Sequence, residues 1–117
     1  MDGHLRNGVV EVGGNARQQF HDARGYGTPT GGNAIRLSRV EAAHLLFRGD
    51  LDAVADSDGQ HLDFQDFFVA SAAAADRFAL RFLVYAELRD RGFYLSPARE
   101  GWPGDDGDPV TDLTVYP

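Results

Sequence analysis

The chain has 117 residues, which is the size of one ordinary domain or of two very small ones. It contains no cysteine, so disulfides, thiolate metal sites and cysteine nucleophiles are excluded, and a cytoplasmic setting is expected. No apolar run approaches the length that crosses a bilayer, and the first residues lack the apolar segment of a secretory signal. No membrane contact is therefore expected.

The charge is strongly acidic. The formal net charge is −7, with 18 Asp and Glu residues, and all 11 basic residues of the Lys and Arg types are arginine. Taken alone, this balance argues against a broad nucleic-acid-binding surface. An acidic chain without lysine suggests a halophilic source, because exposed carboxylates keep a surface hydrated in concentrated salt. A GC-rich genome also favours arginine over lysine, and the two explanations are compatible, so the acidity is weak evidence against RNA binding.

Short strands are predicted in the first third of the chain. Residues 9–12 follow the turn pair Asn7-Gly8 and favour a strand. Residues 16–23 could form a helical turn or a second strand, and the pattern does not separate these. Residues 25–33 are rich in glycine and are predicted to form a loop, and residues 35–37 are a possible strand.

A short helix is predicted next. Ser38 is a suitable N-cap, and Glu41 stands three residues later, which is the pattern of a capping box. Gly49 is placed to end the helix in the left-handed conformation. Residues 51–54 are a possible strand, and the turn residues 56–59 follow it.

A long helix is predicted from Asp63 to Arg91, because apolar and small residues recur there with a period of 3.6. At about 28 residues it is long enough for a kink or break, which we place near Ser71. Gly92 is expected to close the helix by adopting the left-handed conformation beside the cationic last turn.

Two more strands are predicted after the helix, at residues 93–95 and 113–116, on either side of a loop rich in Pro, Gly and Asp. The element order defines an α+β chain: a small N-terminal domain of short strands, a short helix and a long helix, and then two strands. Because a two-stranded hairpin is marginal alone, the strands are expected to begin a second, incomplete domain. We place the division between residues 1–80 and 81–117.

No metal or cofactor site is predicted. Residues 56–59 resemble the start of a calcium loop, but its twelfth position is Phe67 instead of glutamate, so a surface turn is expected. Residues 105–108 are predicted to be a solvated acidic loop. The four histidines lack the spacing of metal ligands; they are His4, His21, His44 and His61.

Arginines and tyrosines of the long helix are predicted to be structural. The arginines are interleaved with acidic residues, so ion pairs on the helix surface are expected instead of an RNA groove. Tyr85 and Tyr94 are predicted to be core or interface residues. The arginines concerned are Arg77, Arg81, Arg89 and Arg91.

Three segments together resemble the archaeal tRNA-intron (tRNA-splicing) endonuclease family. Each segment is weak evidence alone, but their order and spacing match. The likeness indicates the N-terminal unit of the long, tandem-fused halophilic type. The segments are Arg24-Gly25-Tyr26-Gly27, Leu37-Ser38-x-x-Glu41-Ala42-x-x-Leu45-Leu46-x-x-Gly49 and Val84-Tyr85-x-x-Leu88-Arg89-x-Arg91-Gly92-Phe93.

The resemblance implies an activity. Enzymes of this family cut precursor tRNA at both ends of an intron folded as a bulge-helix-bulge, by attack of a ribose 2′-hydroxyl on the adjacent phosphate. The products carry a 2′,3′-cyclic phosphate and a 5′-hydroxyl, and no metal is required. A tyrosine acts as base, a histidine as acid, and a lysine stabilises the charge that develops on the phosphate.

The sequence departs from the family where the catalytic residues are expected. Residues 99–103 replace the family segment Gly-x-Lys-[Phe/Tyr]-Gly-Ala-Asp-Phe. Residues 112–116 still resemble the family pattern Asp-Phe-x-x-Tyr, so Tyr116 aligns with the base tyrosine. No histidine follows Tyr116 and the chain has no lysine, so residues 81–117 look like a truncated and degenerate start of a catalytic-type domain. Tyr116 is expected to be a strand residue, not a working base.

The sequence therefore predicts a structural and RNA-positioning part of a tRNA-splicing endonuclease, inactive by itself. The expected partners are precursor tRNA and a downstream catalytic half or partner subunit, and the full-length protein is expected to be a homodimer. The alternative is a stand-alone, non-catalytic assembly or interaction module. An unrelated small enzyme is least favoured, because no nucleophile–base pair stands out.

Overall fold

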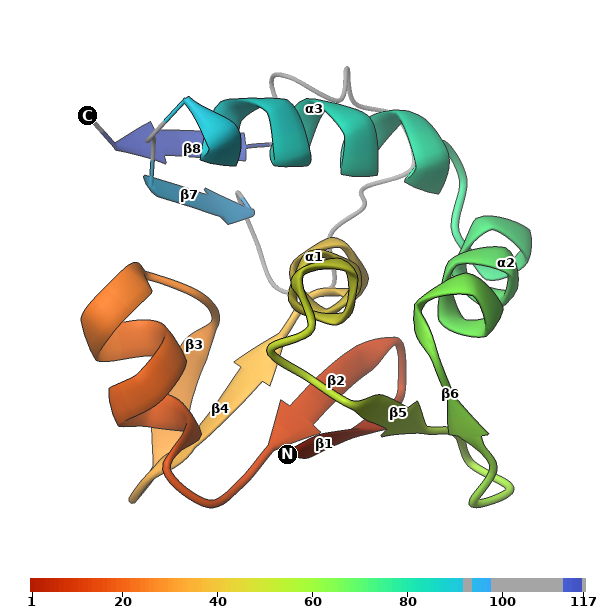
Figure 1. The fold of residues 1–117 in the computed structure, drawn as a ribbon, viewed down its shortest axis with the longest axis horizontal. Coiled ribbons are helices and arrows are strands. Elements are labelled where there is room, and N and C mark those ends of the chain that lie inside the picture. Colours follow the sequence, from red (N-terminus) through yellow and green to blue (C-terminus); the bar gives the residue numbers. More distant parts are fainter. Residues whose placement is uncertain (92–93, 98–112, 117) are drawn as a thin grey trace.

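The computed structural model describes residues 1–91, 94–97 and 113–116, and within them the predicted α+β class is confirmed (Figure 1). A six-stranded sheet has the order β3-β4-β2-β1-β5-β6, and the helices gather on one side of it. The elements are β1 (Asp2–Arg6), β2 (Val9–Val12), the helical turn η1 (Arg17–Asp22), β3 (Thr28–Gly31), β4 (Ala34–Leu37), α1 (Arg39–Arg48), β5 (Ala53–Ala55), β6 (His61–Leu62), α2 (Phe64–Ala74), α3 (Phe78–Asp90), β7 (Tyr94–Pro97) and β8 (Leu113–Tyr116).

The sheet confirms the predicted strands at β2 and β4, and the possible strand at 51–54 is found as β5, shifted to Ala53–Ala55. Three strands were not predicted: β1, β3 and β6. β1 pairs antiparallel with β2 and parallel with β5, which places it at the centre of the sheet. β3 lies in the segment predicted to be a loop, and that prediction was wrong. The segment contains Pro29 and glycines, which disfavour a strand interior, but β3 is an edge strand, where such residues are tolerated.

Helix α1 forms as predicted and occupies the middle of the molecule (Figure 1). The Ser38 hydroxyl accepts from the Glu41 backbone N–H at 3.2 Å, and Glu41 Oε1 accepts from the Ser38 backbone N–H at 3.0 Å. Gly49 ends the helix with φ 83°. Seven consecutive residues, 40–46, are buried, because the sheet covers one side of α1 and the other helices cover the rest.

The predicted long helix is divided into α2 and α3. The break lies at residues 75–77, a few positions beyond Ser71: Ala75 is extended and Arg77 adopts the left-handed conformation with φ 60°. This break, the corner between α2 and α3, lets both helices pack on α1. It also brings aromatic side chains of the two helices together: the ring centroids of Phe68 and Phe78 are 5.2 Å apart. Packing therefore overrides the helix propensity of the alanine run. The predicted stop at Gly92 lies outside the described residues, and α3 ends at Asp90.

A second sheet of two antiparallel strands, β7 and β8, follows α3, and its second strand was predicted at the same residues, 113–116. The predicted division at residue 80 stays a prediction. Helix α3 is continuous across it, and Phe82 and Tyr85 belong to the same core as α1 and the large sheet. Among the described helices, none is long and apolar enough to cross a membrane.

Candidate functional site

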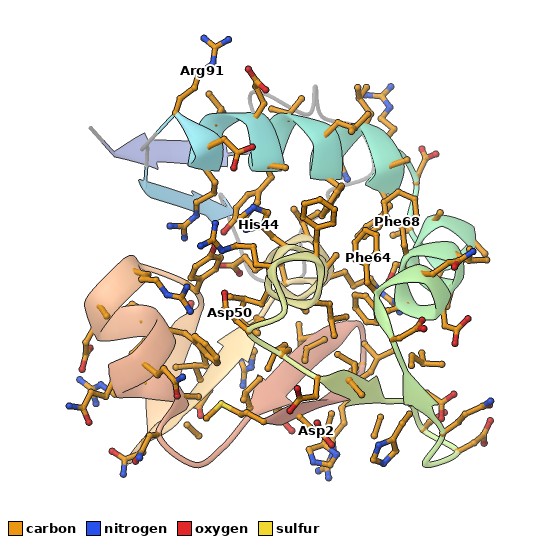
Figure 2. All side chains as sticks on the ribbon, in the orientation of Figure 1. Asp2, His44, Asp50, Phe64, Phe68 and Arg91 are labelled. Carbon is orange, nitrogen blue, oxygen red and sulfur yellow. The ribbon has the colours of Figure 1, made fainter. Side chains whose placement is uncertain are left out.

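The three segments that carry the family resemblance meet in space. The loop before β3, helix α1 and the second half of α3 place five side chains around one another, and His44 lies between α1 and α3 (Figure 2). We call this group the buried junction; it consists of Tyr26, Glu41, His44, Tyr85 and Arg89.

Aromatic contacts form the centre of the buried junction. The Tyr26 hydroxyl and His44 Nδ1 share a hydrogen bond of 2.8 Å, whose direction depends on the histidine tautomer. The two rings stack with centroids 6.0 Å apart, and the Tyr85 ring meets the His44 ring edge-on at 5.5 Å. Exposure is 3% for Tyr26, 2% for His44 and zero for Tyr85, so none of these side chains is open to a substrate.

Arg89 closes the buried junction from α3. Its guanidinium carbon lies 3.8 Å from the centre of the Tyr26 ring, which is a close cation–π contact. Arg89 Nη1 donates to the Arg24 carbonyl at 2.6 Å, and Nε donates to the Tyr85 hydroxyl at 3.2 Å. Arg24 in turn pairs with Asp50, just after α1, at 3.0 Å. Arg89 thus fastens residues 24–26 to α3, and Arg24 links the same segment to the end of α1.

Glu41 holds Gly27, at the C-terminal end of the segment 24–27. Its Oε2 accepts from the Gly27 backbone N–H at 2.7 Å, while Oε1 completes the capping box with Ser38. Gly27 has φ +72°, and a Cβ there would lie 2.8 Å from the Arg36 carbonyl oxygen, so only glycine fits. Burial raises the pKa of Glu41, and the hydrogen bonds from Ser38 and Gly27 oppose that shift.

The electrostatics of the buried junction do not suit acid–base catalysis. Burial, followed by the nearby cations Arg48 and Arg89, lowers the pKa of His44 from 6.5 to about 4. Burial also raises the pKa of Tyr26 and of Tyr85 above the usual value. All three groups are neutral at pH 7, and a general base is most effective when its pKa is near the working pH. The contacts of the buried junction hold residues 24–27, α1 and α3 together.

The lowered pKa of His44 predicts that stability depends on pH. Between pH 4 and 6.5 the unfolded chain binds more protons than the folded chain, so the stability that neutral His44 contributes is lost as the pH falls through this window. We expect the free energy of unfolding to fall by about 1–3 kcal/mol more than in a His44→Asn variant, whose amide does not titrate. Denaturant titrations across the window measure the difference, and comparison with the variant removes the opposite contribution of Glu41. Parallel pH profiles would contradict this account of His44.

Surface ion pairs were predicted for four arginines of the last helix; the prediction is confirmed for Arg91 and wrong for Arg81 and Arg89, and Arg77 lies at the break before α3. Arg91 pairs with Glu87 at 2.8 Å and points away from the core (Figure 2). Arg81, by contrast, has no exposed surface, and it donates to the Asp76 carbonyl at 3.4 Å. Arg89 belongs to the buried junction. The prediction that Tyr85 is a core residue is confirmed.

A separate polar groove of about 820 Å³ lies between the β1–β2 turn, the β5–β6 turn and the start of α1. His4, Arg6, Arg39 and His61 line it together with Asp56. Asp56 Oδ1 accepts from the backbone N–H groups of residues 58 and 60, so this carboxylate holds its own turn, as predicted. Among the residues that the structure describes, no three His, Asp or Glu side chains are grouped as metal ligands would be.

Tyr116, which the family resemblance aligns with the base tyrosine, lies in β8, where it is paired with Tyr94 of β7. The chain's four histidines all lie between residues 4 and 61, in or beside the large sheet, η1 and α1. The predicted position of Tyr116 in a strand is confirmed. That Tyr116 does not act as a base stays a prediction.

Comparison with known proteins identifies the family. Residues 1–68 match the family model described as tRNA intron endonuclease, N-terminal domain. Over all 117 residues the chain is 58% identical to a tRNA-splicing endonuclease of Halobacterium salinarum and 51% identical to one of Haloferax volcanii. A tRNA-splicing endonuclease of Methanosarcina barkeri is 32% identical over the same length. The chain belongs to the tRNA-intron endonuclease family, and it is similar to members from halophilic archaea, as its acidity suggested.

The matches cover the whole of this chain but only part of each relative. The chain spans 31% of the Halobacterium salinarum protein, 32% of the Haloferax volcanii protein and 29% of the Methanosarcina barkeri protein. The family is one of enzymes that remove introns from tRNA, and this chain corresponds to about a third of such an enzyme.

Proposed function

We propose that the chain is the structural and RNA-positioning part of a tRNA-splicing endonuclease that removes introns from precursor tRNA at bulge-helix-bulge sites. The observation that carries the proposal is the 58% identity to the Halobacterium salinarum enzyme over all 117 residues, which span 31% of that enzyme. The catalytic groups would then lie downstream on the same polypeptide or on a partner subunit, in a full-length homodimer that works in the cytoplasm.

The chain alone is proposed to be inactive. Transesterification at a ribose 2′-hydroxyl needs a base, an acid and a charge-stabilising cation within reach of one phosphate. The sequence has no lysine, and His44, the histidine nearest the motif tyrosines, is 2% exposed and neutral. On this proposal residues 1–80 form the N-terminal-like domain, residues 81–117 begin a degenerate catalytic-type domain, and Tyr116 is a strand residue.

The RNA-positioning part of the proposal rests on the groove between the two turns. Arg6 and Arg39 bring two positive charges to this groove on a chain with a net charge of −7. Arginine is well suited to bind the phosphates of RNA, because its donors match phosphate geometry. His4 and His61, on the same groove, add further donors. On this proposal the groove binds RNA phosphates through Arg6 and Arg39 without a basic surface overall, although Asp56 also lines it and Arg6 pairs with Glu11 at 3.7 Å.

Cleavage assays test the proposal. We expect the purified chain, in molar KCl, to leave a labelled bulge-helix-bulge precursor tRNA uncut, as in a blank without protein. A full-length chimera, in which this chain replaces the matching segment of the Halobacterium salinarum enzyme, should cut the same RNA. Its products should carry a 2′,3′-cyclic phosphate and a 5′-hydroxyl, which end-labelling reactions distinguish.

Two results would count against the proposed function. Cleavage by the isolated chain would show that it holds a catalytic site of its own. A chimera that folds but does not cut, beside an active Halobacterium salinarum enzyme, would show that the chain cannot serve as this part. The alternative of a stand-alone interaction module predicts that second result, and it is favoured if the chain also captures neither endonuclease nor precursor tRNA.

A further inference from the structure

Helix α3 is apolar on two opposite sides. Its inner side is buried against α1 through Phe78, Arg81, Phe82 and Tyr85. On the opposite side Leu80 is 51% exposed and Leu83 is 64% exposed. Surface helices of globular proteins normally carry polar residues on the side away from the core. The two exposed leucines therefore form an apolar patch on a side of α3 that also carries Glu87.

The outer side also has a shape that could receive a partner. A shallow groove of about 410 Å³ runs along it, lined by Leu83, Val84, Glu87, Leu88 and Arg91. The exposed surface of this groove is almost entirely carbon, because Glu87 and Arg91 pair with each other at 2.8 Å at its edge. A polar rim around an apolar centre is typical of a docking surface.

The covering partner is best sought in the rest of the endonuclease. The relatives are about three times as long as this chain, which spans 31% of the Halobacterium salinarum protein. Strand β7 begins within a few residues of the end of α3, and β7 and β8 form only a two-stranded sheet among the described residues. Such a sheet is marginal alone and gains stability from further strands and from packing on a helix.

The size of the groove favours a tethered partner over a second copy of the chain. Among the described residues, those that line it are five from α3 and its C-cap, whereas stable interfaces between separate proteins use roughly 20–30 residues on each side. A segment joined through the same polypeptide has a high effective concentration, so a small apolar contact is enough to hold it. The groove thus fits an interface inside one long chain better than a free dimer contact.

We propose that the outer side of α3, where Leu80 and Leu83 are exposed beside the groove, is the surface on which the downstream catalytic half of the endonuclease packs, an inference that rests on the proposed function. In this arrangement α3 lies between two parts of the enzyme. Its inner side packs on the core around α1, and its outer side packs on the downstream half.

Thiol labelling tests the contact, because the chain has no cysteine. Leu83→Cys places a single thiol in the groove, and Val69→Cys is the matched control, since Val69 on α2 is 63% exposed and Leu83 is 64% exposed. Both variants are made in the isolated chain and in the full-length Halobacterium chimera, after removal of any cysteine from the Halobacterium part. We expect equal labelling rates in the isolated chain. In the chimera we expect the Leu83→Cys thiol to react at least tenfold more slowly and the Val69→Cys thiol to be unchanged.

Each other outcome overturns the inference. Equal rates in the chimera would show that the downstream half does not cover the groove. A slow Leu83→Cys thiol in the isolated chain would show that the chain covers it by itself, or by self-association if the rate falls with protein concentration. Cleavage of precursor tRNA by the chimera is scored separately. A cutting chimera with an open groove refutes only the contact, and a protected groove without cutting refutes only the proposed function.

Discussion

Replacing Arg89 with alanine is expected to lower the free energy of unfolding by about 3–4 kcal/mol, because it removes a cation–π contact with the buried Tyr26 ring and two partly buried hydrogen bonds. The Tyr26 ring loses the guanidinium that lies 3.8 Å from its centre. The Arg24 carbonyl and the Tyr85 hydroxyl lose a donor. Chemical denaturation of the isolated chain at neutral pH measures the change.

Arg91→Ala is the matched control for this substitution. Arg91 lies at the end of the same helix, and its side chain is 67% exposed in an ion pair with Glu87. Exposed pairs of this kind contribute little, so the free energy of unfolding should change by no more than about 0.5 kcal/mol. Similar losses for the two variants would mean that the buried junction stabilises the fold no more than a surface ion pair does.

Replacing Glu41 with alanine is expected to cost about 3 kcal/mol. The substitution leaves the backbone N–H groups of Gly27 and Ser38 without their acceptor in a buried site, and it removes half of the capping box. Glu41→Gln should recover part of the loss, because its amide keeps one acceptor oxygen where Glu41 has two. Thermal and denaturant unfolding of the three proteins should show the stability decreasing from the wild type to Glu41→Gln and then to Glu41→Ala.

Glu87→Ala is the control for Glu41. This glutamate is 62% exposed, and its removal should change stability by no more than about 0.5 kcal/mol. If Glu41→Gln were as stable as the wild type, the two N–H groups would not both depend on carboxylate oxygens, and the description of this site would be wrong.

Local signals explain why some elements could be predicted. Helix α1 has a Ser38–Glu41 capping box at one end and a left-handed Gly49 at the other, and both act within a few residues of the helix. The corner at residues 75–77 has no such signal. Neither proline nor glycine marks it, and alanine favours continuing the helix, so tertiary packing fixes it, including the contacts of Phe68 with Phe78 and Phe82.

In the candidate site, too, the contacts between distant segments could not be predicted from local sequence signals. The resemblance identified the three segments that meet, but contacts between residues 26, 44 and 89 depend on how distant elements pack. Arg89 was predicted to lie on the helix surface because acidic residues surround it in sequence. A signal was available: position 89 follows Phe82 and Tyr85 at helical spacing, which places it on the buried side of α3.

The packing of α3 on the rest of the chain determines how much of the sequence must be transferred if this domain is grafted into another protein. The family match ends at residue 68, inside α2, yet the ring of Tyr26 and the imidazole of His44 are covered by side chains from α3. A module excised at residue 68 would carry the shared sequence but lose Phe78, Phe82 and Tyr85 from the core, and it would expose the side chains of Tyr26 and His44 that α3 covers. The smallest transplantable piece therefore reaches at least to Asp90, where α3 ends.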